Sequence, residues 1–157
     1  MKVLIDADAC PVINEAIEIA TTFEIETEIY CDTSHIIDIE GVKTILVQKG
    51  NDAVDFVITN NIKKLDIVIT QDYGLAAMVL AKGGHAINQN GFVYNENNID
   101  QLLYRRHVHK VARKSGARLK GPKKRKTIDD ENFIQEFTVL CKKVLSLTES
   151  QNHSIIN

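Results

Sequence analysis

Apolar residues recur at two spacings along this chain, and the two spacings alternate. Short apolar, β-branched runs predict strands at residues 3–5, 25–30, 42–47, 66–70 and 85–88, with a short sixth strand at 91–94. Apolar residues three or four apart predict helices at about 11–22 and 98–114 and others starting near 52, 73 and 127. Strand and helix alternate five times, which favours a parallel, doubly wound sheet between helical layers.

The predicted strands differ in how much water they should meet. Residues 3–5 and 66–70 are apolar on both faces, as expected of strands in the middle of a covered sheet. In the second strand, Glu24, Glu26 and Glu28 alternate with apolar residues, which predicts one solvent-facing side. We therefore expect an α/β fold with a central, mostly parallel sheet of about five strands and a C-terminal helix.

The length and composition indicate one domain. The chain has 157 residues, 44% of them hydrophobic, enough for one core over residues 1–150, with residues 151–157 expected to fray. No apolar run approaches the roughly 20 residues of a membrane span, and the N-terminus lacks a signal-peptide pattern, so we expect a cytoplasmic protein with no membrane partner. Three widely spaced cysteines predict free thiols. The sequence leaves a homo-oligomer open.

Acidic residues follow two of the predicted strands. Asp6 and Asp8 come after the first, two apart, so both point to one side while the chain stays extended, and Asp72 follows the fourth. In the common strand order 3-2-1-4-5 the first and fourth strands are neighbours where the winding reverses, so Asp6 and Asp72 should meet. Asp52 and Asp55 stand three apart at a helix start and share one face.

Five carboxylates in one cleft would form a hard-oxygen site that suits Mg²⁺ or Mn²⁺. Such ions can activate water and clamp both oxygens of an in-line phosphoryl displacement. We expect Asp6, Asp8, Asp55 and Asp72 to hold the metal and carry the catalysis, with Asp52 as a supporting ligand. A simpler interpretation is that Asp6 only ends its strand and Asp8 caps the helix opened by Pro11.

Charge is divided unevenly along the chain. Residues 1–103 carry six Lys/Arg and sixteen Asp/Glu, whereas residues 104–127 carry eleven Lys/Arg and no acid. Residues 115–127, which contain Gly116, Gly121 and Pro122, predict a basic loop. An unrelieved basic segment favours a polyanion, held through its phosphates. The expected contacts are Arg105, Arg106, Lys110, Arg113, Lys114, Arg118, Lys120, Lys123, Lys124, Arg125 and Lys126.

Four motifs together resemble one bacterial protein family. They are Asp6-Ala-Asp-Ala-Cys-Pro-Val12, Asp52-Ala-Val-Asp55, Ile69-Thr-Gln-Asp-Tyr73 and Gly121-Pro-Lys-Lys-Arg125. The chain thus resembles the YaiI/YqxD family of uncharacterised bacterial proteins, which is grouped with PIN-like domains, whose better-known members are metal-dependent ribonucleases. The resemblance implies a three-layer PIN-like fold, with Asp6, Asp55 and Asp72 at the positions of the superfamily's acids. Asp8, Asp52, Cys10 and the Gly-Pro-Lys-Lys-Arg loop belong to the narrower family.

The leading hypothesis is therefore a metal-dependent phosphodiesterase of ribonuclease type, with RNA as the expected nucleic-acid partner and DNA as the alternative. One alternative is a phosphatase like the haloacid dehalogenases, which also place Asp-x-Asp after the first strand; Ser34 or Thr33 and Lys82 would then complete its motifs. The other is a nucleic-acid binding module with a vestigial acidic cleft. Few aromatic residues are present and none lies within the basic loop, so we expect weak base stacking there. Cys10 is interpreted as a structural thiol.

Overall fold

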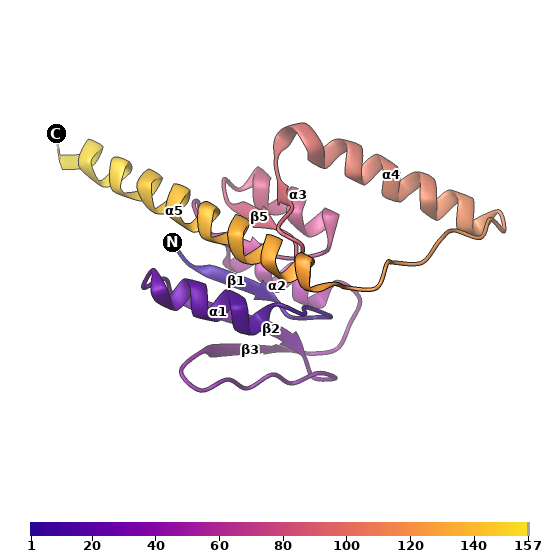
Figure 1. The fold of residues 1–157 in the computed structure, drawn as a ribbon, viewed down its shortest axis with the longest axis horizontal. Coiled ribbons are helices and arrows are strands. Elements are labelled where there is room, and N and C mark those ends of the chain that lie inside the picture. The colour runs from indigo at the N-terminus through magenta and orange to yellow at the C-terminus, as the bar shows by residue number, and fades with distance from the viewer. Residues whose placement is uncertain (157) are drawn as a thin grey trace.

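The fold is an α/β sandwich in three layers, in a computed structural model that describes residues 1–156 (Figure 1). One sheet of six strands runs in the order β3-β2-β1-β4-β5-β6, and every pair is parallel except β5 with β6. The predicted order 3-2-1-4-5 is thereby confirmed. The strands are β1 (Val3–Asp6), β2 (Thr27–Asp32), β3 (Lys43–Val47), β4 (Ile67–Ile69), β5 (His85–Ile87) and β6 (Val93–Tyr94).

Five helices cover the two faces of the sheet. They are α1 (Ile13–Thr22), α2 (Ala53–Asn61), α3 (Tyr73–Ala81), α4 (Glu96–Lys114) and α5 (Thr127–Ile156). Val3 and Ile5 of β1 pack in one buried cluster with α1 and α5, whereas Leu4 packs in a second cluster with α2, α3 and the start of α4. Alternate residues of the strand therefore enter opposite cores, as expected for a central strand.

Helix boundaries follow local capping. Helix α4 begins at Glu96, two residues before the predicted start, because the Asn95 side chain accepts hydrogen bonds from Asn97 N and Asn98 N while Asn98 bonds back to Asn95 N. Helix α1 begins at Ile13, and none of the described side chains caps its first turn. The interpretation of Asp8 as the cap of this helix is thus wrong.

Helix α5 extends further than predicted. Residues 151–156, expected to fray, continue the helix, while residue 157 lies outside the described residues. Ser150 and Ser154 donate from their hydroxyls to the carbonyls of Ser146 and Ser150, one turn back, so these polar side chains bond within the helix. The buried stripe of the helix ends at Val144, so the remainder extends beyond the core (Figure 1).

The second strand lacks the wet side that its sequence predicted. Glu28 is only 4% exposed and its carboxylate accepts hydrogen bonds from Lys2 Nζ at 2.8 Å, Lys43 Nζ at 3.1 Å and Tyr30 OH at 2.7 Å. Burial opposes ionisation, but these three bonds outweigh it and lower the Glu28 pKa to about 2. Of the three alternating glutamates, Glu24 and Glu26 are exposed and precede β2, whereas Glu28 lies within the strand and is buried.

This cluster predicts a pH dependence of stability. Because the folded-state pKa of Glu28 lies below its unfolded value of 4.5, its stabilisation is complete above about pH 4.5 and is lost as pH falls toward 2. We expect Glu28→Gln to lower the free energy of unfolding by about 2 to 3 kcal/mol at pH 7. Urea titrations from pH 7 to 3 should show the difference shrinking below pH 4.5.

Glu26→Gln is the matched control. Glu26 also contacts Lys2 Nζ, at 3.2 Å, but its side chain is 57% exposed. An exposed ion pair contributes about 0 to 1 kcal/mol, so its loss should change little. Equal effects of the two substitutions would contradict the buried-cluster interpretation.

Candidate functional site

Two predicted site residues meet where β1 and β4 end. These strands pair in parallel, Ile5 opposite Ile69, so their carboxyl ends lie side by side. The Thr70 hydroxyl joins them: it donates to Asp6 Oδ2 at 2.8 Å and accepts from the backbone N–H of Asp72 at 3.0 Å. The Asp72 side chain in turn accepts from Leu75 N at 3.0 Å and caps α3. The predicted proximity of Asp6 and Asp72 is explained by this register.

The other three predicted acids lie near Asp6 and Asp72 but come from the turn after β1 and from the N-terminal end of α2. Asp8 lies in the turn after β1, where Ala9 has a positive φ of 53°. Asp52 precedes α2 with a φ of 57°, and Asp55 lies in the first turn. All five predicted carboxylates line one cleft of about 360 Å³, which we call the acidic cleft. The chain leaves β conformation before Asp8, so Asp8 arrives through the turn and not along an extended strand.

A sixth carboxylate, Asp32, lines the acidic cleft and was missed by the sequence analysis. It is the last residue of β2 and accepts a hydrogen bond from Ser34 N at 2.8 Å. Its position after a strand, like that of Asp6, was the available signal. The sequence analysis assigned it only to a turn, because Thr33 and Ser34 follow it.

Crowding perturbs the acids of the cleft. Burial and repulsion from Asp8 and Asp72 raise the Asp6 pKa to about 6, against the hydrogen bond from Thr70. Burial and repulsion from Asp72, Asp6 and Asp52 raise the Asp55 pKa to about 7. Full ionisation at neutral pH is therefore unfavourable unless a positive group enters the cleft.

The donor set suits a hard divalent cation because every candidate ligand is a carboxylate oxygen. The five acids share the cleft, but in residues 1–156 no three acidic, histidine or cysteine side chains are gathered closely enough to form a ready metal-binding group. The assignment of Asp6, Asp8, Asp52, Asp55 and Asp72 as metal ligands therefore stays a prediction.

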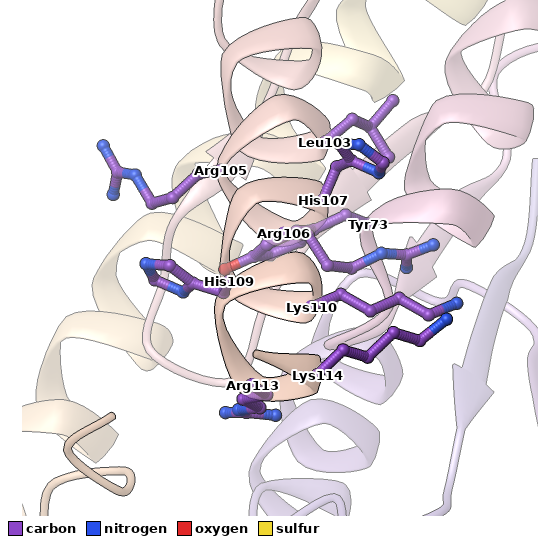
Figure 2. A pocket seen from close by; sticks show the side chains of 9 residues that line it. All are labelled: Tyr73, Leu103, Arg105, Arg106, His107, His109, Lys110, Arg113 and Lys114. Atoms are coloured by element: carbon purple, nitrogen blue, oxygen red, sulfur yellow. The ribbon is translucent and has the colours of Figure 1, made fainter. Parts of the chain in front are cut away.

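A basic groove lies along α4 on one side of this region. It has a volume of about 650 Å³, and its lining includes Arg105, Arg106, Lys110, Arg113 and Lys114. Figure 2 shows Arg106, Lys110 and Lys114 pointing to the same side of the helix, with Arg105 and His109 directed to the other. Four-residue spacing makes this stripe about 12 Å long. Arg106 Nη1 also lies 3.4 Å from Asp72 Oδ1, which connects the groove to the acidic cleft.

A second basic cavity adjoins the acidic cleft at the loop of residues 115–126, which connects α4 to α5 (Figure 1 shows the course of this loop). Its volume is about 520 Å³, it contains Lys123, Lys124, Arg125 and Lys126, and it shares Ala9 and Gln71 with the acidic cleft. Arg118 and Lys120 are exposed on the same loop. The acidic cleft is thus flanked by positive charge from two separate segments.

Arg125 has a structural partner set that the sequence did not indicate. Its guanidinium donates to Asp130 Oδ1, Asn90 Oδ1 and the Gln89 carbonyl, at 2.9, 2.6 and 2.8 Å. The turn that carries Gln89 and Asn90 also packs directly on α5, since a Cβ on Gly91 would lie 2.5 Å from the Asn132 carbonyl oxygen. Arg125 therefore anchors the loop to the β5–β6 turn, a different role from the phosphate contact predicted for it.

The cysteines fit the structural interpretation. Cys31 and Cys141 are buried, and Cys10 is half-buried beside the turn that carries Asp8. Burial raises the Cys10 pKa to about 11, so it is a neutral thiol at physiological pH. None of the helices of residues 1–156 combines the length and apolar character needed to cross a bilayer.

Comparison with known proteins places the chain among close relatives. The model of the family described as "Uncharacterized BCR, YaiI/YqxD family" matches residues 4–143. A UPF0178 protein of Exiguobacterium sibiricum is 49% identical over 140 residues, which cover 89% of this chain and 96% of that protein. A UPF0178 protein of Clostridium acetobutylicum is 43% identical over 139 residues, covering 87% and 94% of the two chains. These matches span nearly the whole of each relative.

One solved structure with a distant similarity to this chain is that of a mutant of Rae1 (YacP) from Bacillus subtilis. It covers 90% of this chain and 92% of that chain, with a TM-score of 0.43 and 15% identity. This likeness is too distant to add to the fold described above.

The charge crowding predicts how removal of one acid affects stability. Because the folded-state pKa of Asp6, about 6, lies above its unfolded value of 3.8, ionised Asp6 costs stability at neutral pH, and this cost shrinks as pH falls from about 6 to 3.8. We expect Asp6→Asn in EDTA at pH 7.5 to raise the free energy of unfolding by about 1 kcal/mol. The gain should vanish at pH 4, measured by thermal and urea unfolding.

Glu18→Gln, on the exposed side of α1, removes one acid outside the cleft and should leave stability unchanged. A loss of stability in Asp6→Asn that persists at every pH would contradict the prediction. It would show that the hydrogen bond from Thr70 to the ionised carboxylate outweighs the repulsion.

Proposed function

The chain belongs to the YaiI/YqxD family, and we propose that it catalyses metal-dependent cleavage of nucleic-acid phosphodiester bonds. The description of that family specifies no activity. RNA is the leading substrate and DNA the second. The observation that carries the proposal is the acidic cleft between two basic surfaces. The carboxylates alone would repel a phosphate backbone. Lys and Arg side chains of the two basic surfaces would bind the backbone where it passes over the cleft.

The chain's own residues have distinct roles in this proposal. Asp6, Asp8, Asp55 and Asp72 would hold Mg²⁺ or Mn²⁺, with Asp52 in support. When bound, the metal would supply Lewis-acid stabilisation and an activated water. Thr70 positions Asp6 through its hydrogen bond and Asp72 through its backbone N–H. Arg106, 3.4 Å from Asp72, is near enough to stabilise phosphate charge at the edge of the cleft.

The phosphatase alternative loses support from the position of Lys82. A lysine of that mechanism has to reach the acidic cleft, whereas Lys82 Nζ donates to the Thr59 carbonyl at 2.5 Å. Neither Thr33 nor Ser34 is among the residues that line the cleft. The arrangement therefore favours nucleic acid over a small phosphate ester.

A non-catalytic binding module is the second candidate function. The observation that favours it is the absence, within residues 1–156, of three potential ligands gathered into a metal-binding group. Such a module would use the basic surfaces in the same way and would not require the carboxylates to converge. Cleavage and binding therefore have to be measured separately.

The first experiment tests catalysis. Single-turnover cleavage of labelled single-stranded RNA and DNA with Mg²⁺ or Mn²⁺ should fall by orders of magnitude in Asp6→Asn and Asp72→Asn, since each 1.4 kcal/mol of lost transition-state stabilisation is about tenfold. Nucleic-acid affinity should remain. Glu18→Gln is the control and should cleave like the wild type.

Two outcomes would contradict the catalytic proposal. Cleavage that persists unchanged in both variants would show that another site or a contaminating nuclease is responsible. Failure of the wild type to cleave any substrate with either metal, while it still binds, would favour the binding module.

The second experiment tests the basic loop. The combined substitution of Lys123, Lys124 and Lys126 by Ala should weaken RNA binding regardless of base sequence, because these side chains would contact phosphates. The slope of log K against log salt should flatten by up to about 0.7 per lost contact on a single strand. Arg125 is kept because it anchors the loop.

Lys142→Ala with Lys143→Ala, two exposed charges on α5, serves as the control. If this pair flattened the slope as much as the loop substitution does, the effect would come from net charge and not from a phosphate site. A loss that depended on base sequence would also contradict the predicted contact.

A further inference from the structure

A small cavity lies between the acidic cleft and the α4 groove, and the proposed catalysis does not use its apolar part. Its volume is about 290 Å³. It shares Asp52, Asp55 and Asp72 with the acidic cleft and Arg106 with the α4 groove. Its remaining lining includes Phe56, Leu75 and Met78. We call this cavity the Phe56 pocket.

The apolar side of the pocket is open to solvent. Phe56 on α2 is 69% exposed and Met78 on α3 is 53% exposed, while Leu75 beneath them is 2% exposed. Residues of the same helices that face the sheet, such as Ile58 and Val79, are fully buried. An aromatic ring and a thioether therefore border a hollow that the rest of the chain does not fill.

Charge is arranged in two parts around this hollow. Carboxylates stand on the side of the acidic cleft, and the guanidinium of Arg106 stands at the border with the α4 groove. Gly74 leaves room for the Asp72 carboxylate beside that guanidinium, since a Cβ there would lie 3.0 Å from Asp72 Oδ1, whereas both terminal nitrogens of Arg106 would be at ordinary contact distance, 3.6 and 3.7 Å. Phosphate is attracted to Arg106 and the Lys110–Lys114 stripe beyond it, and repelled from the pocket itself.

We propose that the Phe56 pocket receives one unpaired base of single-stranded nucleic acid, stacked on the ring of Phe56, while Arg106 holds the adjoining phosphate. The proposal rests on the proposed function and deepens it by specifying the substrate as single-stranded. A base is flat, uncharged and apolar on its faces, which suits Phe56 and Met78. Its amino and ring N–H groups can donate to the carboxylates at the rim, which a phosphate cannot do.

This occupant also explains the position of the pocket. A base inside a duplex is stacked on both faces and cannot reach Phe56, whereas a base of a single strand is free to turn into the hollow. Its backbone would then continue in one direction toward Lys110 and Lys114, which Figure 2 shows on the same side of α4 as Arg106, and in the other direction over the acidic cleft. Stacking is tolerant of base identity, so the pocket selects strandedness and not sequence.

The experiment measures binding in EDTA, where metal-dependent cleavage cannot occur. Fluorescence anisotropy compares three labelled RNA probes of equal length: a mixed-sequence single strand, a single strand that is abasic at every nucleotide and so has no base to place in the pocket, and a blunt duplex. The proteins are wild type, Phe56→Ala, Phe56→Leu and Phe56→Trp. Because Phe56 is largely exposed, these variants should fold, and circular dichroism melts check that they do.

We expect the wild type to bind the intact single strand about 5- to 100-fold more tightly than the strand that is abasic throughout. Phe56→Ala and Phe56→Leu should lose this difference, since both lack a ring face. Phe56→Trp should keep it. The duplex should bind more weakly than the single strand to wild type and equally to wild type and Phe56→Ala.

Tyr104→Ala is the matched control, because Tyr104 on α4 is 70% exposed and lines neither the pocket nor the groove. An equal loss in Tyr104→Ala would overturn the proposal, as would an unchanged abasic penalty in Phe56→Ala. A change of mass between wild type and Phe56→Ala by sedimentation would also overturn it, because a second copy would then occupy the face.

The outcome is independent of catalysis. Absence of cleavage by the wild type, together with a Phe56-dependent abasic penalty, would remove the nuclease proposal and leave the base pocket. Cleavage that depends on Asp6, with no effect of Phe56 on binding, would remove the base pocket and leave the nuclease proposal.

Discussion

The fold and its candidate site both depend on the burial of β1 between two paired strands and two helical layers. Its backbone is hydrogen-bonded to β2 and β4, and its side chains enter the α1–α5 core and the α2–α3 core in turn. No residue of such a strand can shift by one position without moving an apolar side chain out of its core. Asp6 is therefore held in place at the strand end, and with it the Thr70 hydroxyl that connects it to Asp72.

Electrostatics organises the surface around this rigid point. Carboxylates from β1, β2, α2 and the start of α3 enter one cleft, while the compensating cations come from α4 and from the loop before α5. Two of the carboxyl groups have raised pKa values because this negative charge is crowded and partly desolvated. The pKa of Glu28, in contrast, is lowered because two lysines and Tyr30 donate hydrogen bonds to its carboxylate. The chain thus neutralises one buried acid internally and leaves the cleft acids only partly compensated, by Arg106.

The sequence predicted a residue's position where strand order or helical spacing specifies that position. Asp6 and Asp72 could be expected to meet because parallel strands that are adjacent in the sheet end at the same edge, and Asp52 and Asp55 because three residues make nearly one helical turn. The prediction failed where neither strand order nor helical spacing specifies the partner. Glu28 looked solvent-facing because alternation cannot reveal Lys2 and Lys43, and Arg125 looked free because nothing nearby in sequence indicates Asn90 or the Gln89 carbonyl.

The sequence by itself determined the order of strands and helices, the acids that end them and the separation of acidic from basic segments, because periodicity, capping and charge are local properties of the chain. The tertiary structure alone decided which surfaces adjoin. It brought Asp32 into the cleft, placed Arg106 beside Asp72 and left Phe56 uncovered at the edge of the carboxylates. A helix pattern shows which face is apolar enough to be buried, but whether another element covers a given side chain depends on the packing of the whole chain.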